Sequence, residues 1–596
     1  MFGKIIRIED KKVIVENLKR EILSNLIGYH VVFEDTKKMV GEIIFVNENE
    51  FHINLIGEIV NNSLIPGIMK YPLGTAQTRI VYRQELELIL GEQDVNIPKN
   101  LLLGKSNVYD NFVFSVNTSD FFANHFAIIG NTGAGKSCGV SRLLQNLFSD
   151  TKTNPTNSHI VIFDTYGEYQ SALEKINTHP GINIKNYTTS NNANNQEMIR
   201  IPPYLLEVDD LAILLNLNDS ELIPIIEKTL SYVYIFKGND SICQKYKNDI
   251  IAKSFLDMLS SGKPPQQIRD QVIAFLTKYY TDEINLETLI KQPGLNRTIR
   301  QCLNIDTQGK MLALELLVYF LKWYSEINIE KISITPTEYT LDDIYYAMEF
   351  ALVSEGVLNN SGIYEKMNKL KTRLHGLING EYVKYFEYDG FISKENYVKK
   401  LFSTSDGENC QIIDISFNNV DDRFAKTLVK IFSKMFYKFT TTLEQRGSFP
   451  INILVEEAHR YIQKDNDVDV IGYNIFDRIS KEGRKYGIIL GLITQRISEL
   501  SQTSLSQCSN FIVFRMYNPE DIKIVSSIAS NVTMDAVEKL KSLSPGMALV
   551  FGTSFNIPLI TRFEIPNPMP TSTTVDLTQM WYWNVKKCKI YIFLIF

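Results

Sequence analysis

The residues with the clearest chemical potential form a glycine-rich octapeptide, Gly130-Asn131-Thr132-Gly133-Ala134-Gly135-Lys136-Ser137, which matches GxxxxGK[ST] and is followed by Cys138. The motif comes after an apolar run at Phe126–Ile129 and opens an amphipathic pattern, which is the strand–turn–helix context it requires. Glycines let backbone N–H groups surround phosphates, and a helix N-terminus adds positive potential. Lys136 is suited to the β- and γ-phosphates and Ser137 to Mg²⁺. The segment predicts a site for ATP and Mg²⁺ rather than a chance glycine turn.

A second set of polar residues follows the apolar run Ile451–Val455, where Glu456 and Glu457 stand next to each other. Alone, this pair is as typical of a solvated acidic turn as of a catalytic site. Together with the glycine-rich loop it favours hydrolysis, with Glu456 near the metal and Glu457 as the general base that polarises water.

Two further candidates lie between this strand and the end of the next one. Gln495 follows the run Ile488–Ile493 and is predicted to sense the γ-phosphate, although a strand-end cap is the simpler alternative. Arg484 lies in a basic segment that is also typical of a solvated helix C-terminus. The functional hypothesis is that Arg484 is an arginine finger.

Length and composition indicate a folded protein of several domains. The 596 residues suggest about three to four domains, and the 44% apolar and 22% charged fractions are typical of globular proteins. The net charge of −6 does not indicate a protein that coats nucleic acid, but it is compatible with local basic contacts. The six cysteines include no CxxC pair, which argues against a zinc site or disulfides and favours a cytoplasmic location.

Hydropathy predicts no contact with a membrane. No apolar run approaches the roughly 18 residues that a membrane span needs. The apolar end of the chain, Ile590–Phe596, is interpreted as a buried or partner-docked tail.

Strand and helix patterns divide the chain into five parts. Residues 1–95 are predicted to form a small β-barrel. Residues 96–200 and 401–565 alternate strands and helices, which is typical of a parallel α/β sheet and predicts the two parts of a RecA-like P-loop core. Residues 201–400 are predicted to be a helical insertion, and residues 566–596 a C-terminal tail. The barrel strands are expected at Lys4–Ile8, Val13–Glu16, His30–Glu34, Gly41–Val46, Phe51–Ile59, Thr78–Tyr82 and Leu86–Leu90.

Two other segments carry weaker expectations. The polar run Thr188–Asn195 is predicted to be a mobile loop. A basic helix that bears Lys366, Lys369 and Arg373 has the charge to contact DNA phosphates, although a solvated helix face is the more common explanation.

Taken together, these motifs resemble the HerA branch of the HerA/FtsK family of hexameric DNA translocases. The family's Asp-Pro-His-Gly-Glu segment reads Asp164-Thr-Tyr-Gly-Glu168 here, and Asn124 stands where a basic residue is expected. The segments that carry the resemblance are Gly130–Ser137, Phe163–Tyr169, Val455–His459, Ile479–Gly487, Thr494–Arg496, Leu505–Asn510 and Asn518–Asp521.

The resemblance implies a homohexameric ring with ATP between subunits and double-stranded DNA in its pore, and it places an arginine finger in the segment of Arg484. It also implies an effector partner, either a nuclease in DNA-end processing or a nuclease or sirtuin-like protein in antiphage defence. Two alternatives stay open. One is an ATP-binding ring scaffold that assembles and regulates an effector without processive translocation. The other is a conjugation or secretion ATPase, which the predicted barrel and the missing membrane segment disfavour.

Overall fold

The structure is a computed structural model of the 596-residue chain, and its described part runs from Gly3 to Trp581. The residues outside the described part are 1–2, 10–11, 19–25, 68–69, 92–99, 110–111, 150–153, 191–195, 293–294, 326–336, 355–360, 530–531, 533, 572–576, 578–580 and 582–596. The apolar segment Ile590–Phe596 therefore lies outside it.

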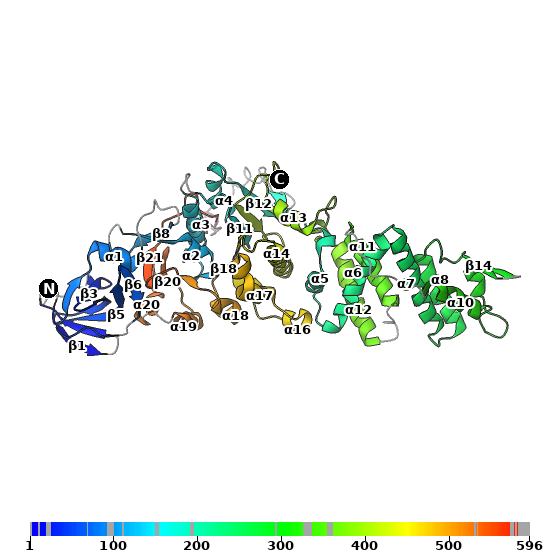
Figure 1. Ribbon diagram of the computed structural model, residues 1–596, viewed down its shortest axis with the longest axis horizontal. Helices are drawn as coiled ribbons and strands as arrows, with labels where there is room; N and C mark the ends of the chain where they lie inside the picture. Colours follow the sequence, from blue (N-terminus) through cyan, green and yellow to red (C-terminus); the bar gives the residue numbers. More distant parts are fainter. Residues whose placement is uncertain are drawn as a thin grey trace.

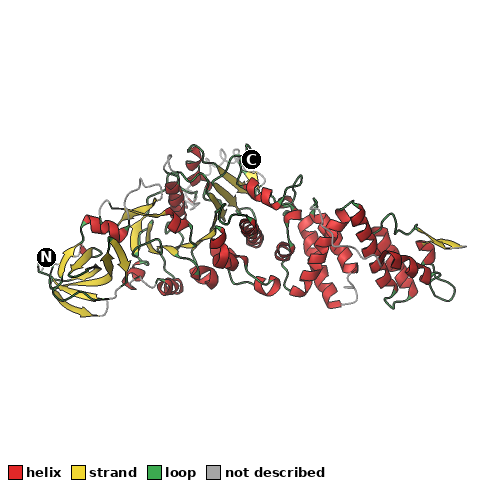
Figure 2. Cartoon of the chain, in the orientation of Figure 1, coloured by secondary structure: helices red, strands yellow, loops and turns green. Residues whose placement is uncertain are grey.

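Three regions follow one another along the long axis of the molecule (Figure 1). N-terminal strands occupy one end, a large sheet flanked by helices lies in the middle, and a helical region extends to the other end (Figure 2). No helix among the described residues is long and apolar enough to cross a membrane.

The N-terminal region is an antiparallel sheet in the order β1-β2-β5-β4-β3-β7, with β6 paired to β5. Val13, Phe33 and Ile53 fill its core. The N–H of Gly3, just before β1, donates to Thr78 of β7 at 3.0 Å, so the two ends of the sheet approach each other. This contact suits the predicted barrel, whose closure stays a prediction. The strands are β1 (Ile5–Glu9), β2 (Lys12–Glu16), β3 (His30–Glu34), β4 (Lys38–Val46), β5 (Glu50–Val60), β6 (Ser63–Pro66) and β7 (Gln77–Ile80).

The predicted strand at Leu86–Leu90 is wrong, because Arg83–Leu90 forms helix α1. Leucines at alternate positions fit a strand, but the residues that the helix buries have helical spacing. Glu85 accepts a hydrogen bond from the N–H of Tyr82 at 3.0 Å, which fixes the helix start. The buried apolar residues are Leu86, Ile89 and Leu90.

Helix α1 packs against the central sheet, because its buried side chains share a core with Leu101 and Phe114 of that sheet. A chain that begins at residue 96 should therefore melt at a lower temperature than one that begins at residue 82. Each buried Leu or Ile contributes roughly 1.5–3 kcal/mol. Thermal melting of the two shortened chains checks this, and equal melting temperatures would show that α1 does not stabilise the core.

The middle of the molecule is a twelve-stranded sheet in the order β13-β12-β16-β11-β17-β18-β10-β19-β20-β21-β8-β9. The run from β13 to β19 is parallel and the rest is antiparallel. The predicted α/β sheet is confirmed, and the strands at Phe126–Ile129 and Ile451–Val455 have the predicted bounds. The strands are β8 (Asn100–Ser106), β9 (Val113–Asn117), β10 (Phe126–Ile129), β11 (His159–Asp164), β12 (Ile184–Thr188), β13 (Glu197–Met198), β16 (Ile412–Ser416), β17 (Ile451–Val455), β18 (Ile488–Thr494), β19 (Asn510–Phe514), β20 (Met547–Gly552) and β21 (Leu559–Arg562).

Helices cover this sheet, and α3 shows why they do so. Its Val140, Leu143 and Leu144 are buried, as their spacing on one helix face predicts. The helices of this region are α2 (Thr118–Phe122), α3 (Lys136–Leu147), α4 (Gln170–Leu173), α14 (Asp422–Thr442), α15 (Ala458–Tyr461), α16 (Asp467–Ile471), α17 (Ile475–Glu482), α18 (Gln502–Ser506), α19 (Pro519–Ile528) and α20 (Met534–Lys539).

Residues 201–400 lie between β13 and β16, and their described part is mostly helical. Ile226 and Val233 of α6 and Met367 and Leu374 of α12 are buried, as their periodicity predicts. The domain boundaries themselves stay a prediction. The elements are α5 (Val208–Leu214), α6 (Ile223–Lys237), α7 (Ser241–Leu259), α8 (Pro265–Lys278), β14 (Leu289–Gln292), β15 (Leu295–Thr298), α9 (Ile299–Cys302), α10 (Leu314–Ser325), α11 (Leu341–Ser354), α12 (Ser361–Ile378) and α13 (Lys394–Leu401).

Buried ion pairs on α14 tie the helical region to the central one. Lys434, which is 4% exposed, lies 3.2 Å from Glu207 and 3.1 Å from Asp210, at the start of α5. One turn earlier, Lys430 pairs at 2.5 Å with Asp465, within the central region itself. Breaking such pairs leaves an uncompensated buried charge, which makes this junction specific.

The basic face of α12 is largely engaged within the chain. Lys366 pairs with Asp219 and with Glu221, the latter at 3.2 Å. Arg373 donates to the carbonyl of Leu215 at 2.8 Å. Two of the three predicted DNA contacts therefore have internal partners, which favours a structural role for this face.

The polar run Thr188–Asn195 is buried where it begins. Thr188 ends β12, Thr189 is 1% exposed, and the Thr189 hydroxyl donates to the carbonyl of Ser416 at 3.1 Å. The prediction of a mobile loop is therefore wrong for these two residues, and residues 191–195 lie outside the described part.

Candidate nucleotide site

Three neighbouring strands bring the predicted site residues to one edge of the central sheet. β18 lies between β10 and β17 and is parallel to both, with Ile129 opposite Thr494 and Val455 opposite Leu492. The glycine-rich loop, the two glutamates and Gln495 all follow the carboxyl ends of these strands, so they meet at the same edge. Ligands of open parallel sheets bind at this edge.

The glycine-rich loop forms one wall of a cavity of about 680 Å³. Gly135 has φ of +110°, and a Cβ at this position would lie 2.9 Å from the backbone nitrogen of Gly546, so only glycine fits here. The N–H of Gly130 donates to the carbonyl of Thr494 at 3.2 Å, which fastens the loop to β18. Thr132, Gly133, Gly135, Lys136, Ser137 and Cys138 line the cavity, whereas Gly130, Asn131 and Ala134 shape the loop behind it.

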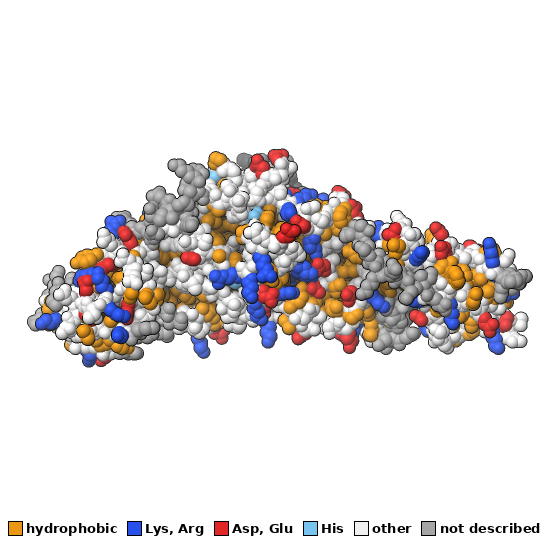
Figure 3. Space-filling model, in the orientation of Figure 1, with side chains coloured by type: hydrophobic (Ala, Val, Ile, Leu, Met, Phe, Trp, Pro, Cys, Tyr) orange, Lys and Arg blue, Asp and Glu red, His pale blue; other side chains and the backbone are white. Residues whose placement is uncertain are grey.

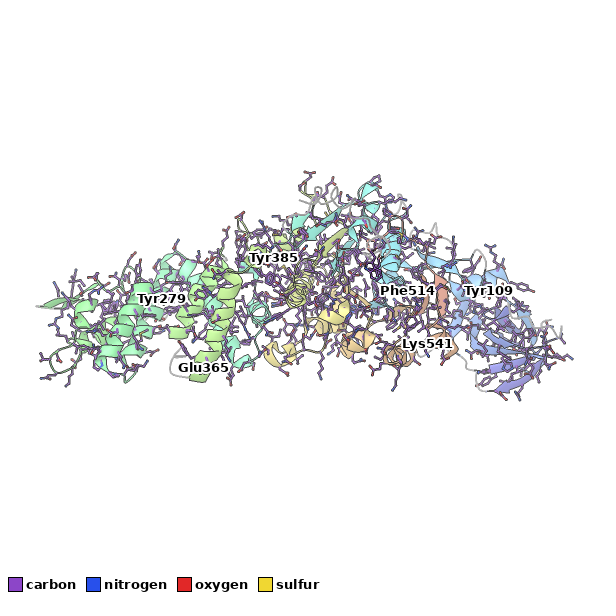
Figure 4. All side chains as sticks on the ribbon, turned by 180° about the vertical axis from the view of Figure 1, so that it is seen from behind. Tyr109, Tyr279, Glu365, Tyr385, Phe514 and Lys541 are labelled. Carbon is purple, nitrogen blue, oxygen red and sulfur yellow. The ribbon has the colours of Figure 1, made fainter. Side chains whose placement is uncertain are left out.

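Phe514, at the end of β19, supports the loop from below and lies beside α3 in Figure 4. A Cβ on Gly130 would approach the Phe514 Cβ to 2.6 Å, and one on Gly139 would approach its ring to 2.5 Å. These close approaches set the height of the loop above the sheet.

The ammonium of Lys136 lies within this cavity and donates to the carbonyl of Asn131 at 3.3 Å. Burial lowers the pKa of Lys136, and the nearby Glu457, Glu456 and Glu168 oppose that change. The nearby carboxylates therefore favour the charged form of Lys136. An anionic ligand could replace the Asn131 carbonyl as the partner of this ammonium group.

Glu457 has an unusual backbone conformation, with φ of +47° and ψ of 45°. For a residue other than glycine this conformation costs about 1–3 kcal/mol and is common at functional sites. Its carboxylate accepts a hydrogen bond from Gln495 Nε2 at 3.2 Å and lies 3.2 Å from His459 Nδ1. Burial raises the pKa of Glu457, while Lys136 and Arg460 lower it.

Gln495 connects Glu457, the candidate base, to the glycine-rich loop. Its Oε1 accepts from the Thr132 hydroxyl at 2.7 Å, and its Nε2 donates to Glu457. The side chain therefore spans the space between the loop and the candidate base, rather than capping its own strand.

Glu456 is 5% exposed and lies next to the fully buried Asp164. Burial raises the pKa of Glu456 well above its ordinary range, and Asp164 raises it further. Glu456 Oε2 has no donor partner among the described residues. Two adjacent buried carboxyls need either a shared proton or a cation, so their chemistry fits a divalent metal ion.

The remaining oxygen donors also fit Mg²⁺. Ser137 and Glu456 line the same cavity, and the described residues contain no larger cluster of metal-binding side chains. Mg²⁺ is usually held by one or two protein oxygens together with substrate phosphates and waters. This donor set matches that pattern, whereas a dedicated protein cage would need more ligands.

Arg484 is not part of this cavity. It lies in the 3₁₀ turn Gly483–Tyr486, before the amino end of β18, and its side chain is exposed. The pKa of His125 is lowered to about 4, mainly by burial and in part by the nearby Arg484 charge, which places Arg484 by the start of β10. Because β18 has 7 residues and a strand rises about 3.3 Å per residue, roughly 20 Å of strand separate Arg484 from Gln495.

The sequence prediction gave no role to Glu168 and Tyr166, which line the cavity. Burial raises the pKa of Glu168, and the Ser137 hydroxyl beside it lowers that pKa. The Tyr166 hydroxyl accepts from Arg460 at 2.8 Å. Both follow β11, which neighbours β17, so their position after a buried strand is the signal that identifies them.

A segment near the C-terminus was also missed. Phe563, Glu564, Ile565, Pro566, Met569 and Pro570 line the cavity, although the tail was predicted to begin at residue 566. No motif marks these residues, because their contribution depends on the path of the chain after β21.

Comparison with known proteins places this site in a family. The family described as "Helicase HerA, central domain" matches residues 103–436, which is more than half of the chain. The chain belongs to the HerA helicase family. This HerA-family member is therefore an ATP hydrolase of the P-loop class.

Curated relatives match the HerA-family chain over most of its length. The DNA double-strand break repair helicase HerA of Pyrococcus furiosus is 23% identical over 514 residues, which cover 86% of this chain and 76% of that protein. The probable DNA double-strand break repair helicase HerA of Methanocaldococcus jannaschii is 24% identical over 538 residues, which cover 89% and 86%.

Solved structures are more distant. VirB4 of Thermoanaerobacter pseudethanolicus is 13% identical with a TM-score of 0.42, and the match covers 78% of this chain and 96% of that one. The plasmid coupling protein TrwB with a non-hydrolysable GTP analogue is 12% identical with a TM-score of 0.43, and the match covers 82% and 93%. Similarity at this level says nothing about activity.

Proposed function

We propose that this HerA-family protein is an ATP-driven translocase of double-stranded DNA that works as a homohexameric ring. The observation that carries the proposal is the division of catalytic groups between two edges of one sheet. Lys136, Glu457 and Gln495 are at the carboxyl edge, whereas Arg484 is exposed at the amino edge, too far away to reach its own site. This position supports the proposal, because in a ring of identical subunits an exposed arginine could complete a neighbour's site.

Within one subunit, each side chain has a defined part in ATP hydrolysis. Lys136 is placed to bind the β- and γ-phosphates, and Ser137 and Glu456 would hold Mg²⁺. When bound there, the ion would supply positive charge that offsets the charge developing on the phosphate oxygens. Glu457 accepts a proton from the attacking water as a general base. The roles rest on the shared cavity and on the carboxyl pair of Glu456 and Asp164.

Gln495 is suited to report the state of the γ-phosphate. Its two hydrogen bonds, to Thr132 and to Glu457, cross the space above the loop. A phosphate that occupies this space has to displace or share them. The same side chain therefore couples ligand binding at the loop to the orientation of the base and to β18.

Double-stranded DNA is the proposed substrate because the relatives over most of the chain are DNA helicases by name. The net charge of −6 requires that contacts to DNA be local. On the face shown in Figure 3, Lys and Arg side chains gather over the central region and are interspersed with Asp and Glu. Such a surface permits transient phosphate contacts that a moving motor can release.

An effector protein, either a nuclease or a sirtuin-like enzyme, is the proposed partner, and the N-terminal sheet is the proposed docking platform. This sheet exposes apolar side chains, among them Ile6 at 54%, Phe45 at 49% and Ile65 at 53%. It lies at the end of the molecule away from the helical region (Figure 1), so a bound protein would leave the nucleotide site free.

The proposal predicts that linear double-stranded DNA stimulates ATP turnover several-fold and that the protein displaces a triplex-forming strand from a duplex in an ATP-dependent way. Lys136→Ala should lose both activities, because the phosphate contact is removed. The measurements are steady-state hydrolysis with and without DNA, and strand displacement over time. Slow turnover that ignores DNA, without displacement, would instead support a ring scaffold that organises an effector.

A further inference from the structure

Two chemically different sets of residues line the cavity that holds the glycine-rich loop. Thr132, Gln495 and Glu457, which hydrogen bonds join, form the polar set together with Lys136. The other set consists of Cys138, at the start of α3, and of the segment after β21. That segment contributes Phe563, Ile565, Pro566, Met569 and Pro570, which are all apolar.

Side chains of α3 fix this segment, residues 563–571, at its start and in its middle. Glu564 forms ion pairs with Arg142 and, at 3.0 Å, with Lys105. Gln145 accepts from the N–H of Asn567 and donates to the carbonyl of Pro568, both at 2.9 Å.

Helix α4 and the turn after β11 fix the far end. The Ser171 hydroxyl donates to the carbonyl of Met569 at 2.9 Å. The N–H of Thr571 donates to the carbonyl of Glu168, also at 2.9 Å. The segment is therefore held across the cavity at both ends, in contact with the helix and the turn that also carry site residues.

Between these fixed points two apolar side chains stay exposed. Ile565 is 75% exposed and Met569 is 56% exposed, although Asn567, Pro568 and Met569 form backbone hydrogen bonds to α3 and α4. Phe563 next to them is only 6% exposed and packs against Phe514, with ring centroids 5.4 Å apart. Small-molecule sites are lined mainly by apolar side chains, so this wall suits a flat apolar group.

We propose that residues 563–570 form the nucleobase subsite of the ATP site, with Ile565, Met569 and Cys138 in contact with the base. This rests on the proposed phosphate binding at Lys136, because phosphates at the polar end direct the base to the apolar end. A cavity of about 680 Å³ lies within the size range of small-molecule sites.

The subsite recognises the shape of a purine rather than its hydrogen-bonding edge. Among residues 563–570 that line the cavity, Glu564 has the polar side chain, and this carboxylate is paired with Arg142 and Lys105. Discrimination between purines requires polar groups that are left unpaired by the wrong base. ATP and GTP should therefore bind with affinities within about tenfold of each other.

The test compares ATP with inorganic tripolyphosphate, which lacks a base, by isothermal titration calorimetry with Mg²⁺ on the full chain. The double variant Ile565→Ser, Met569→Ser should weaken ATP binding about tenfold and leave tripolyphosphate binding unchanged. Lys136→Ala should weaken both. Ile242→Ser, at an exposed isoleucine of α7 in the helical region, is the matched control and should change neither.

The outcomes separate this subsite from the ATP site itself. If the double variant binds ATP as the wild type does, or loses ATP and tripolyphosphate equally, the base does not contact these residues. A preference for ATP over GTP above a hundredfold would also overturn recognition by shape. If Lys136→Ala changes the affinity for neither ATP nor tripolyphosphate, Lys136 does not bind the phosphates. The proposed nucleobase subsite is then wrong as well.

Discussion

Glu457→Gln should abolish ATP turnover while leaving ATP bound. The amide cannot accept the proton of the attacking water, and general-base catalysis typically contributes about 10²–10⁴ in rate. Glutamine has the same shape, so the left-handed backbone at this position and the contact to Gln495 are kept. Lys136→Ala, in contrast, should weaken binding itself. Single-turnover hydrolysis and nucleotide retention on the purified protein separate the two effects.

The matched control for this prediction is Glu444→Gln, which makes the same chemical change at an exposed position after α14. It should hydrolyse ATP as the wild type does. If Glu457→Gln also hydrolyses ATP at nearly the wild-type rate, Glu457 is not the base. Glu168, the other cavity carboxylate close to Ser137, would then be the residue to test.

Arg484→Ala should abolish hydrolysis without loss of ATP binding or of hexamers. The transition state places charge on the γ-phosphate oxygens, and an arginine from a neighbouring subunit is worth about 10³–10⁵ in rate. Arg484→Lys should be nearly as inactive, because a planar guanidinium holds two oxygens at once and an ammonium does not. Lys485→Ala removes the adjacent exposed charge and should keep most of the activity.

Mixed rings decide whether Arg484 acts in trans. Subunits with Arg484→Ala and subunits with Lys136→Ala are each inactive alone, but a mixed ring contains interfaces that combine an intact loop with an intact arginine. Such rings should regain part of the hydrolysis rate. If mixed rings with proven co-assembly remain inactive and Arg484→Ala alone still turns over ATP, Arg484 is not the finger.

Local sequence patterns predict much of the core, because the spacing of apolar residues and glycines reflects the conformation of each segment. Strand β10, the glycine-rich loop and α3 were predicted in place, since a buried strand, a glycine turn and an amphipathic helix each have their own residue spacing. The same reasoning placed Glu456 and Glu457 after β17. It failed at α1, where the leucines fit two periodicities and only burial against Leu101 and Phe114 selects the helix.

Contacts between distant segments were beyond this reasoning. Gln495 was predicted at a strand tip, but its bridge from Thr132 to Glu457 depends on the order β17-β18-β10 in the sheet. Likewise, the proton or cation required by Glu456 follows from its burial beside Asp164, which lies on another strand.

By itself the sequence determined the chemical class of this protein, because phosphate binding by backbone N–H groups demands glycines, a lysine and a hydroxyl at fixed spacing. It also determined which strand ends carry the carboxylates. The tertiary structure decided which residues share a cavity. The path of residues 563–571 across α3 and the exposure of Arg484 at the opposite edge of the sheet result from packing between segments hundreds of residues apart. Such packing depends on the burial of the whole core, which no local spacing encodes.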